Sequence, residues 1–349
     1  MNPARADRLR KLLADSVPFP PRGRGLFVDT GLDFPAREAA AAMGPGRVLV
    51  MERDLVAARE LGRALPDLEV RHAARAEPDE GDLVVLPAAK HRLALFLELE
   101  RLAAAVGPPG ALALYGARRE GILPAQDLLA RHCDLAAPVT RAGSRLLLAR
   151  PRGGTGWGLT RPPARYEAAA RGVRVTVAAR PGLFSWDALD PATALLLEAC
   201  DPRDGDRLLD LGCGAGVAAA VLLAEGRVGE AVLADSDALA LEASRETLAA
   251  NGLAGEVLAS DAGEDLDAGP FDLVVCNPPL HRGFAAERRT PARMAAAAHG
   301  LLAPRGRLFM VTPPTLGARR LLAASFGDAE RVAAAPGMEV WRAVRAERR

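Results

Sequence analysis

An apolar run that ends in two prolines strongly constrains how this chain folds. Residues 271–276, with the sequence FDLVVC, lead directly into Asn277-Pro278-Pro279. Because proline has no backbone N–H to donate to a sheet, a strand formed by this run must end there. The turn that follows displays the Asn277 amide and nearby carbonyls at the strand's carboxyl end, where open α/β sheets bind ligands. An amide and a carbonyl held together suit a planar amino group; the alternative is an ordinary proline turn.

A glycine-rich loop lies upstream of this run. The strand-like residues 207–211 enter Gly212-Cys213-Gly214-Ala215-Gly216, and a helix-like run from Val217 to Ala224 follows. Glycines let backbone N–H groups approach a ligand closely, and the amino end of a helix favours negative charge. The third glycine follows the second by two residues rather than three, so the loop lacks the dinucleotide-binding spacing. It therefore predicts a ligand site of another kind.

Two more strand-like runs end in acidic residues. Residues 231–234 lead into Asp235, and residues 256–260 lead into Asp261-Ala262. A carboxylate at the end of the second strand is placed to bind both hydroxyls of a ribose. The alternation of strands and helices predicts an α/β fold with a doubly wound sheet. Its strands are expected near residues 207–211, 231–235, 256–260, 271–276, 306–312, 329–334 and 338–345, after a leading hairpin over 165–171 and 173–178.

From about Pro181 to Arg345 the chain resembles the class I S-adenosylmethionine-dependent methyltransferases. As a whole it resembles, more narrowly, the bacterial ribosomal RNA guanine-N2 methyltransferases of the small-subunit (16S) type, which are related to the large-subunit (23S) type. The narrower match rests on PGLFS (181–185), DLGCGAGV (210–217), EASR (242–245), NGL (251–253) and NPPLH (277–281). The resemblance implies two tandem Rossmann-like methyltransferase domains with seven-stranded doubly wound sheets, of which the N-terminal one is degenerate.

The resemblance also implies roles for individual residues. S-adenosylmethionine is the expected cofactor, and its expected ligands are Asp210, Gly212, Cys213, Gly214, Gly216, Asp235, Ser236, Asp261, Ala262 and Asn277. In this scheme Asp210 orients the loop or contacts the methionine amino group, Asp235 binds the ribose, and Ser236 flanks the adenine with Asp261-Ala262. The Asn277 side-chain oxygen and the Pro278 carbonyl are the expected catalytic groups, because together they can accept hydrogen bonds from a target amine.

Substrate contacts are expected directly after the catalytic pair. The candidates are Pro279, Leu280, His281, Arg282 and Phe284. Leu280 departs from the family, which usually has an aromatic residue at this position to stack on a flipped base. Phe284 or Phe184 is an alternative source of such a ring. His281 is placed either to take a proton or to touch RNA.

The first half of the chain repeats the hydrophobic pattern of the second half. Residues 82–92 parallel 272–282, and residues 110–116 parallel 306–312. Residues 46–54 are expected where the second half has 206–214. On that alignment the glycine loop and Asn-Pro-Pro are both replaced, so we expect this half to bind no cofactor and either to shield the catalytic domain or to help hold RNA. The predicted domains are 1–150 and 165–349, joined by a Gly/Pro-rich linker over 151–164.

Bulk properties predict a cytoplasmic enzyme without a membrane span, and the resemblance implies a monomer that acts on ribosomal RNA or the 30S subunit. The formal net charge is +1 and the pI about 7.8, so RNA recognition has to rely on a local patch rather than on a basic chain. The four cysteines show neither a CxxC pair nor a zinc-site spacing, so no metal is expected. No apolar signal region or membrane span is evident in the sequence.

Three functions remain compatible with these residues. The first is methylation of a guanine N2 in 16S ribosomal RNA, with 23S ribosomal RNA as the close alternative. The second is the same transfer to adenine N6, to a protein glutamine or to a small molecule, since Asn-Pro-Pro suits all these planar amines. The third is a non-catalytic RNA-binding or assembly factor, against which the glycine loop, Asp235 and Asn277 argue.

Overall fold

The computed structural model describes residues 11–13, 15–17, 23–31, 36–141, 143–154, 156–279 and 289–347, with Arg119 described by its backbone alone. The chain forms two compact units, Met1–Pro162 and Pro163–Arg349, which we call the first and second units. The division lies inside the glycine- and proline-rich stretch 151–164. No helix among these residues is long and apolar enough to cross a membrane.

The second unit is built on a seven-stranded sheet in the order β13-β12-β11-β14-β15-β17-β16. Its strands are β11 (Asp206–Leu211), β12 (Val228–Asp235), β13 (Glu256–Ala259), β14 (Phe271–Cys276), β15 (Leu302–Thr312), β16 (Glu330–Ala335) and β17 (Met338–Val344). The first five are parallel, and β17 pairs antiparallel with both β15 and β16. The strands predicted for this sheet are therefore confirmed. The apolar run of β14 fits its central position, because a parallel strand is covered on both faces.

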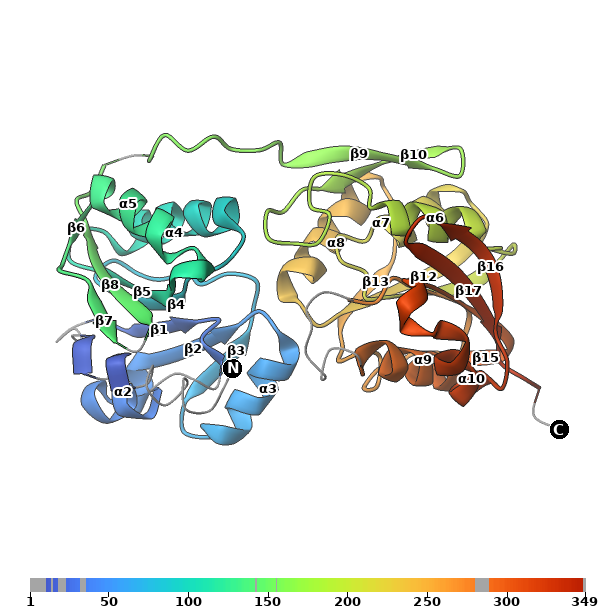
Figure 1. The fold of residues 1–349 in the computed structure, drawn as a ribbon, viewed down its shortest axis with the longest axis horizontal. Helices are drawn as coiled ribbons and strands as arrows, with labels where there is room; N and C mark the ends of the chain where they lie inside the picture. The colour runs from blue at the N-terminus through green and yellow to red at the C-terminus, as the bar shows by residue number, and fades with distance from the viewer. Residues whose placement is uncertain are drawn as a thin grey trace. The chain divides into compact units, whose positions relative to one another are not determined.

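Helices cover both faces of this sheet. They are α6 (Pro191–Ala199), α7 (Val217–Ala224), α8 (Ala238–Ala250), α9 (Thr290–Leu301) and α10 (Ala318–Phe326). The first three lie on one face and the last two on the other (Figure 1). The predicted hairpin is present as β9 (Arg165–Ala170) and β10 (Val173–Ala178), which pair antiparallel. Asp237 caps α8, because its Oδ1 accepts the Leu239 N–H at 2.9 Å.

The first unit has the same strand order, β3-β2-β1-β4-β5-β8-β6, with β7 added beside β8. Its strands are β1 (Gly25–Val28), β2 (Val48–Glu52), β3 (Glu69–His72), β4 (Leu83–Pro87), β5 (Ala111–Ala117), β6 (Cys133–Leu135), β7 (Val139–Arg141) and β8 (Ser144–Pro151). Its helices include α2 (Ala36–Met43), α3 (Leu55–Ala64), α4 (Arg92–Val106) and α5 (Ile122–His132).

The expected seven strands are wrong for this first sheet, which has eight. Both β6 and β7 pair antiparallel with β8, at separate positions along it. Pro138 lies between them and cannot donate a ladder hydrogen bond, so a single continuous edge strand does not form there. In the second unit one unbroken strand, β16, occupies the corresponding edge.

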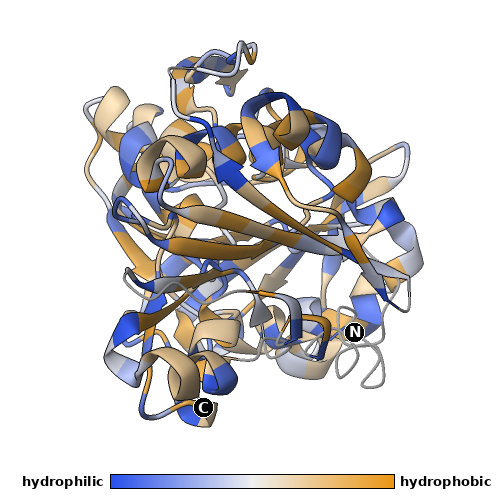
Figure 2. Ribbon diagram, turned by 90° about the vertical axis from the view of Figure 1, so that its left-hand side faces the viewer, coloured by the Kyte–Doolittle hydropathy of each residue, from blue (hydrophilic) through white to orange (hydrophobic). Residues whose placement is uncertain are grey.

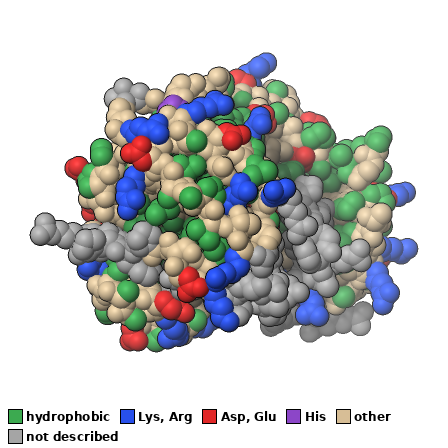
Figure 3. Space-filling view, turned by 60° about the vertical axis from the view of Figure 1, so that its left-hand side comes forward, with side chains coloured by type: hydrophobic (Ala, Val, Ile, Leu, Met, Phe, Trp, Pro, Cys, Tyr) green, Lys and Arg blue, Asp and Glu red, His purple; other side chains and the backbone are tan. Residues whose placement is uncertain are grey.

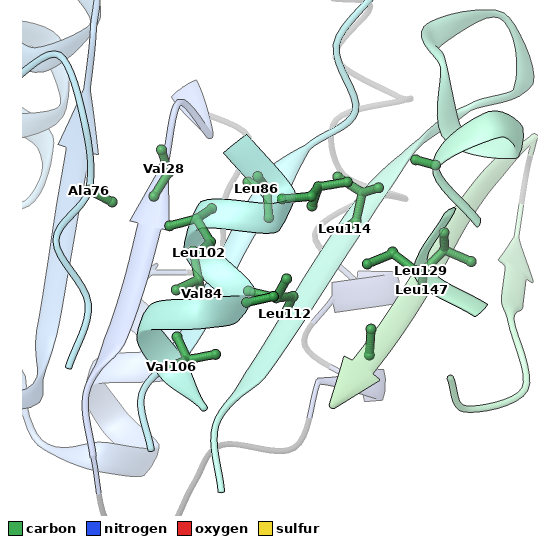
Figure 4. Packing of buried hydrophobic residues seen from close by; sticks show 14 of the residues in the cluster. Val28, Ala76, Val84, Leu86, Leu102, Val106, Leu112, Leu114, Leu129 and Leu147 are labelled. Atoms are coloured by element: carbon green, nitrogen blue, oxygen red, sulfur yellow. The ribbon is translucent and has the colours of Figure 1, made fainter. Parts of the chain in front are cut away.

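The core of the first unit lies on both faces of its sheet, because successive strand residues point to opposite sides. Leu26 and Val28 of β1 pack with α4 residues such as Leu102, whereas Phe27 between them packs in the other cluster, with Ala39 of α2. Figure 4 shows α4 and its neighbouring strands meeting through such side chains, and Figure 2 shows the hydrophobic strands enclosed between helical layers.

The topology corrects one part of the predicted repeat. β1 occupies the position of β11, and β2 occupies that of β12, so residues 46–54 correspond to 229–237 and not to 206–214. The equivalent of the glycine loop instead follows β1, at Asp29-Thr30-Gly31. The sequence pattern concealed this because β1 is short and one glycine stands where the second unit has three. The parallels of 82–92 and 110–116 agree with the order of the strands.

Candidate active site

The glycine loop after β11 is held against β12 by hydrogen bonds from its backbone N–H groups. The Gly212 N–H donates to the Ala234 carbonyl at 2.8 Å, and the Gly214 N–H donates to Asp235 Oδ2 at 2.9 Å. Gly212 has a φ of +80°, and a Cβ added there would lie 3.0 Å from Met294 Cε. Both the left-handed backbone and the close packing beneath the loop therefore favour glycine at this position.

Asp210, the fifth residue of β11, is buried directly under this loop. Its Oδ2 accepts the Ala219 N–H at 3.0 Å, which links the strand to the first turn of α7. Burial raises the pKa of the Asp210 carboxyl to about 7, and the nearby charge of Asp235 acts in the same direction. A carboxyl with such a pKa changes its charge near neutral pH and responds strongly to a cation brought close to it.

Asp235 ends β12 with both carboxylate oxygens engaged. Oδ2 accepts the Gly214 N–H, and Oδ1 accepts the Asp237 N–H at 2.9 Å. Burial raises its pKa, while these backbone hydrogen bonds oppose the shift. Ser236 lies next to it, at the start of the turn into α8.

Asp261 and Ala262 follow β13 with one interaction that sequence reasoning missed. Arg293 of α9 reaches Asp261 Oδ2 at 2.7 Å and Glu264 Oε2 at 2.6 Å. Ala262 has a φ of 55°, a left-handed conformation that is uncommon for alanine. Asp261-Ala262, which are expected to flank the adenine, thus form a tight turn that a salt bridge connects to α9.

Asn277 follows β14, and its side chain is held from the start of α6. Its Nδ2 donates to Asp190 Oδ2 at 3.1 Å and to Thr193 Oγ1 at 2.9 Å. Asp190 is the N-cap of α6 and also accepts the Thr193 N–H at 2.8 Å. Neither residue was among the predicted site residues. The Asp-Pro sequence signals a helix start, but a cap pattern does not say which strand end it faces.

A pocket in the second unit lies beside Asn277 and the glycine loop. It brings together five predicted site residues, namely Asp210, Gly212, Cys213, Gly214 and Asn277. Its wall also contains residues that were not predicted as ligands, including Tyr166, Ser185, Asp190, Thr193 and Leu196, together with Phe184, which was considered as a base-stacking ring. Gly216, Asp235, Ser236, Asp261, Ala262, Pro278 and Pro279 are outside this lining.

Tyr166 and Phe184 give the pocket an aromatic wall. Burial raises the pKa of the Tyr166 hydroxyl to about 12, with Asp187 and Asp190 acting in the same direction, so the phenol stays neutral. Phe184 is 55% exposed, which is unusual for so large an apolar residue. An exposed ring beside a polar amide is a surface on which a planar base can stack.

Four predicted substrate contacts, Leu280, His281, Arg282 and Phe284, lie outside the described residues; Pro279 is described and exposed. On the face shown in Figure 3, basic side chains are interspersed with acidic and apolar ones. Among the described residues no cluster of histidine, cysteine and acidic side chains forms a metal site. The four cysteines are free and buried, and burial raises the pKa of Cys213 in the loop.

Comparisons with known proteins agree with this geometry. Residues 174–342 match the family model "Methyltransferase small domain". The T. thermophilus 16S rRNA N2 G1207 methyltransferase (RsmC), solved in complex with AdoMet and guanosine, matches 96% of this chain and 91% of its own, with a TM-score of 0.75 and 26% identity. In sequence over its second unit, and in fold over nearly its whole length, the chain is thus similar to class I ribosomal RNA guanine-N2 methyltransferases. Both tandem α/β units were expected from the resemblance.

The alignments with curated relatives cover a smaller share of each chain than the structural match does. "Ribosomal RNA small subunit methyltransferase C" of Pectobacterium atrosepticum is 40% identical over 169 residues, which are 48% of each chain. The protein of the same name from Cronobacter sakazakii is 35% identical over 234 residues, 66% of each chain. The chain thus spans about half the length of the first curated relatives it matches.

Proposed function

We propose that the protein transfers a methyl group from S-adenosylmethionine to the exocyclic N2 of a guanine in 16S ribosomal RNA. The observation that supports this best is the shared pocket: Asn277, at the end of β14, and the loop from Gly212 to Gly214 line one cavity. One side suits a cofactor and the other suits a planar amine. The names of the similar proteins, including the guanosine complex, support guanine in 16S ribosomal RNA as the acceptor.

The residues present fit the cofactor. A Cβ added at Gly214 would meet nothing within 4 Å, so the backbone is open to a ligand at this point of the loop. The loop would hold the methionine part, the Asp235 carboxylate the ribose, and the turn at Asp261-Ala262 the adenine. Asp210 stands under the loop, where its carboxyl favours a nearby positive charge. When bound, S-adenosylmethionine supplies an activated methyl group.

Asn277 and Pro278 orient the acceptor. The guanine N2 lone pair is delocalised into the ring, so the amine has to be turned toward the methyl group. Hydrogen bonds from the amine to Asn277 Oδ1 and the Pro278 carbonyl aim that lone pair and stabilise positive charge as it develops on nitrogen. No strong base is required, because the methylated amine loses its proton readily to water. Positioning is the main contribution of the protein.

The guanine has to leave its stack to reach the pocket. It is reached either in a single-stranded loop or by flipping from a helix. In this proposal the exposed ring of Phe184 stacks on the guanine. It takes the role of the aromatic residue that the family usually has at the position of Leu280. We further propose that the protein acts as a cytoplasmic monomer on the RNA or the 30S subunit. The first unit then serves as a degenerate copy without cofactor that shields the catalytic unit or helps hold RNA.

The test is transfer of labelled methyl from S-adenosylmethionine to undermethylated small subunits, large subunits and free ribosomal RNA, followed by nucleoside analysis. N2-methylguanosine in the small subunit or its RNA supports the proposal. Label confined to the large subunit contradicts the 16S assignment. No label with demonstrated cofactor binding indicates a different acceptor, and no cofactor binding indicates a non-catalytic role. The Asn277→Ala variant controls for contaminating activity.

A further inference from the structure

The side-chain amide nitrogen of Asn277 has two hydrogen-bond acceptors at the start of α6. It donates to Asp190 Oδ2 at 3.1 Å and to Thr193 Oγ1 at 2.9 Å. The Thr193 hydroxyl donates its own hydrogen to Asp190 Oδ2 at 3.2 Å, so its oxygen is available as an acceptor. A carboxylate only accepts hydrogen bonds. The three groups therefore determine which way the amide points, with nitrogen toward α6 and Oδ1 away from it.

The holding residues are themselves well anchored. Thr193 is buried, with 7% of its surface exposed, and its N–H donates to Asp190 Oδ2 at 2.8 Å. Pro191, between them, stands at the first position of α6, where its fixed φ suits a helix start. Asp190, Thr193 and Asn277 all line the same pocket. This arrangement joins residues 84 and 87 positions apart in the sequence.

We infer that Asp190 and Thr193 are positioning residues that hold Asn277 with Oδ1 as the acceptor for the target amine. The two orientations of an asparagine amide have nearly the same shape but opposite hydrogen-bonding character. If the amide turned over, its NH₂ would face the NH₂ of the substrate, donor against donor, and the lone pair would lose its alignment. The identity of the amine rests on the proposed function; the orientation of Asn277 does not.

Kinetics of matched variants test the catalytic part of this inference. Thr193→Val removes the hydroxyl at nearly constant volume, and Thr193→Ser retains it. Asp190→Ser keeps an N-cap oxygen but is too short to reach Asn277. We expect Thr193→Val and Asp190→Ser to lower kcat roughly tenfold with KM for S-adenosylmethionine unchanged, and Thr193→Ser to stay near the unmodified protein. Asp54→Ser makes the same cap change at α3 in the first unit and should leave kcat unchanged.

An NMR measurement tests the orientation without any substrate. The chain has three asparagines, Asn2, Asn251 and Asn277, so protein labelled with ¹⁵N-asparagine gives three side-chain NH₂ pairs, and Asn277→Asp identifies the relevant one. Asn251 is an internal reference, because its Nδ2 donates to the Thr176 and Thr247 carbonyls at 2.8 and 2.7 Å. We expect slow hydrogen exchange for both pairs, with only that of Asn277 accelerated by Thr193→Val and restored by Thr193→Ser.

The outcomes separate this inference from the proposed function. If the unmodified protein methylates no guanine but the Asn277 pair responds as expected, the orientation holds and the proposed acceptor is wrong. If Thr193→Val leaves the Asn277 pair unchanged, the inference is overturned whatever the activity. It is also overturned if the pair loses its protection while kcat keeps its value, since Asn277 would then not need to be held. A fall in kcat that Thr193→Ser shares would reveal a packing role instead.

Discussion

The carboxyl ends of the two sheets share a backbone framework but differ in the side chains on it. The Gly31 N–H donates to Glu52 Oε1 at 2.8 Å, just as the Gly214 N–H donates to Asp235 Oδ2 at 2.9 Å. The turn after each first strand also begins alike, because the Asp29 and Gly212 N–H groups each donate at 2.8 Å to a carbonyl of the second strand. An acidic residue at the end of the second strand is thus part of how this fold closes its first loop, whether or not a ligand binds.

The difference lies at two positions beside this framework. Asp210 in the second unit corresponds to Phe27 in the first, where the ring is fully buried in the core. Asn277 corresponds to Pro87, which offers neither an amide nor a backbone N–H. In the first unit, therefore, a core phenylalanine takes the place of the carboxyl in the pocket wall. A proline at the strand end takes the place of the side chain proposed to accept hydrogen bonds from the target amine. On the proposed function, the chemistry therefore depends on Asp210 and Asn277, whereas the shared hydrogen bonds belong to the fold.

The largest expected effect follows loss of Asn277. Asn277→Ala should lower methyl transfer by roughly 100-fold or more, which is the usual loss when one group that stabilises transition-state charge is removed. Cofactor binding, measured by calorimetry, should stay nearly unchanged. Pro87→Ala, at the corresponding position of the first unit, is the control and should keep full activity. Equal losses of transfer and cofactor affinity in Asn277→Ala would contradict the assigned role.

A second prediction concerns pH, because each unit holds a carboxyl whose pKa burial raises to about 7. These carboxyls are Glu52 in the first unit and Asp210 in the second. Between pH 5 and 7 the unfolded chain has released both protons while the folded protein retains them, so stability falls as pH rises. Each shift corresponds to a loss of about 2 kcal/mol over this interval.

Hydrogen exchange at pH 5 and 7, corrected for the intrinsic pH dependence of exchange, assigns these losses to the separate units. Glu52→Gln should remove the pH dependence of opening for β1 and β2 in the first unit. Asp210→Asn should reduce it for β11 and β14 in the second, where Asp235 keeps its own raised pKa. Each variant should leave the other unit unchanged. A pH dependence that neither variant reduces would mean that neither carboxyl is buried as described.

Asp235 and Glu52 provide a direct comparison at equivalent positions. Asp235→Ala should weaken S-adenosylmethionine binding by about tenfold to thirtyfold, because hydrogen bonds to a charged group are lost. Glu52→Ala removes an equivalent loop acceptor and should leave the dissociation constant unchanged. Unchanged affinity in Asp235→Ala would refute the ribose assignment. Weakened affinity in Glu52→Ala would show that the first unit contributes to cofactor binding.

Sequence reasoning predicted the second unit well because its elements have strong local signals. The apolar run of β14 ends at two prolines, and the strand predicted over residues 271–276 agrees with the structure. In the first unit, β1 has four residues and no glycine loop, so the more conspicuous β2 was aligned with β11 in its place. The hydrogen bond from Gly31 to Glu52 reveals the true correspondence, but such a bond is visible only in three dimensions.

The site shows the same limit. Strand ends could be predicted to converge, since parallel strands place their carboxyl ends at one edge of a sheet. The approach of Asp190 and Thr193 to Asn277 could not, because a helix cap is a local pattern and its partner lies 87 residues away. Arg293 on Asp261 was missed for the same reason. Long-range side-chain pairs depend on the exact positions at which helices pack on the sheet. Hydrophobic periodicity does not specify these positions.

The smallest expected effects come from the helix caps, which the two units share. Asp54 Oδ1 accepts the Ala57 N–H at 2.9 Å at the start of α3, and Asp237 Oδ1 accepts the Leu239 N–H at 2.9 Å at the start of α8. Asp54→Ala and Asp237→Ala should each destabilise their own unit by about 1 kcal/mol, the usual cost of losing an N-cap oxygen. Denaturant unfolding measures this loss, and transfer rates at saturating cofactor should stay unchanged in both. If Asp237→Ala also slows methyl transfer, this cap contributes to the reaction as well as to stability. The framework that the two units share would then not be purely structural.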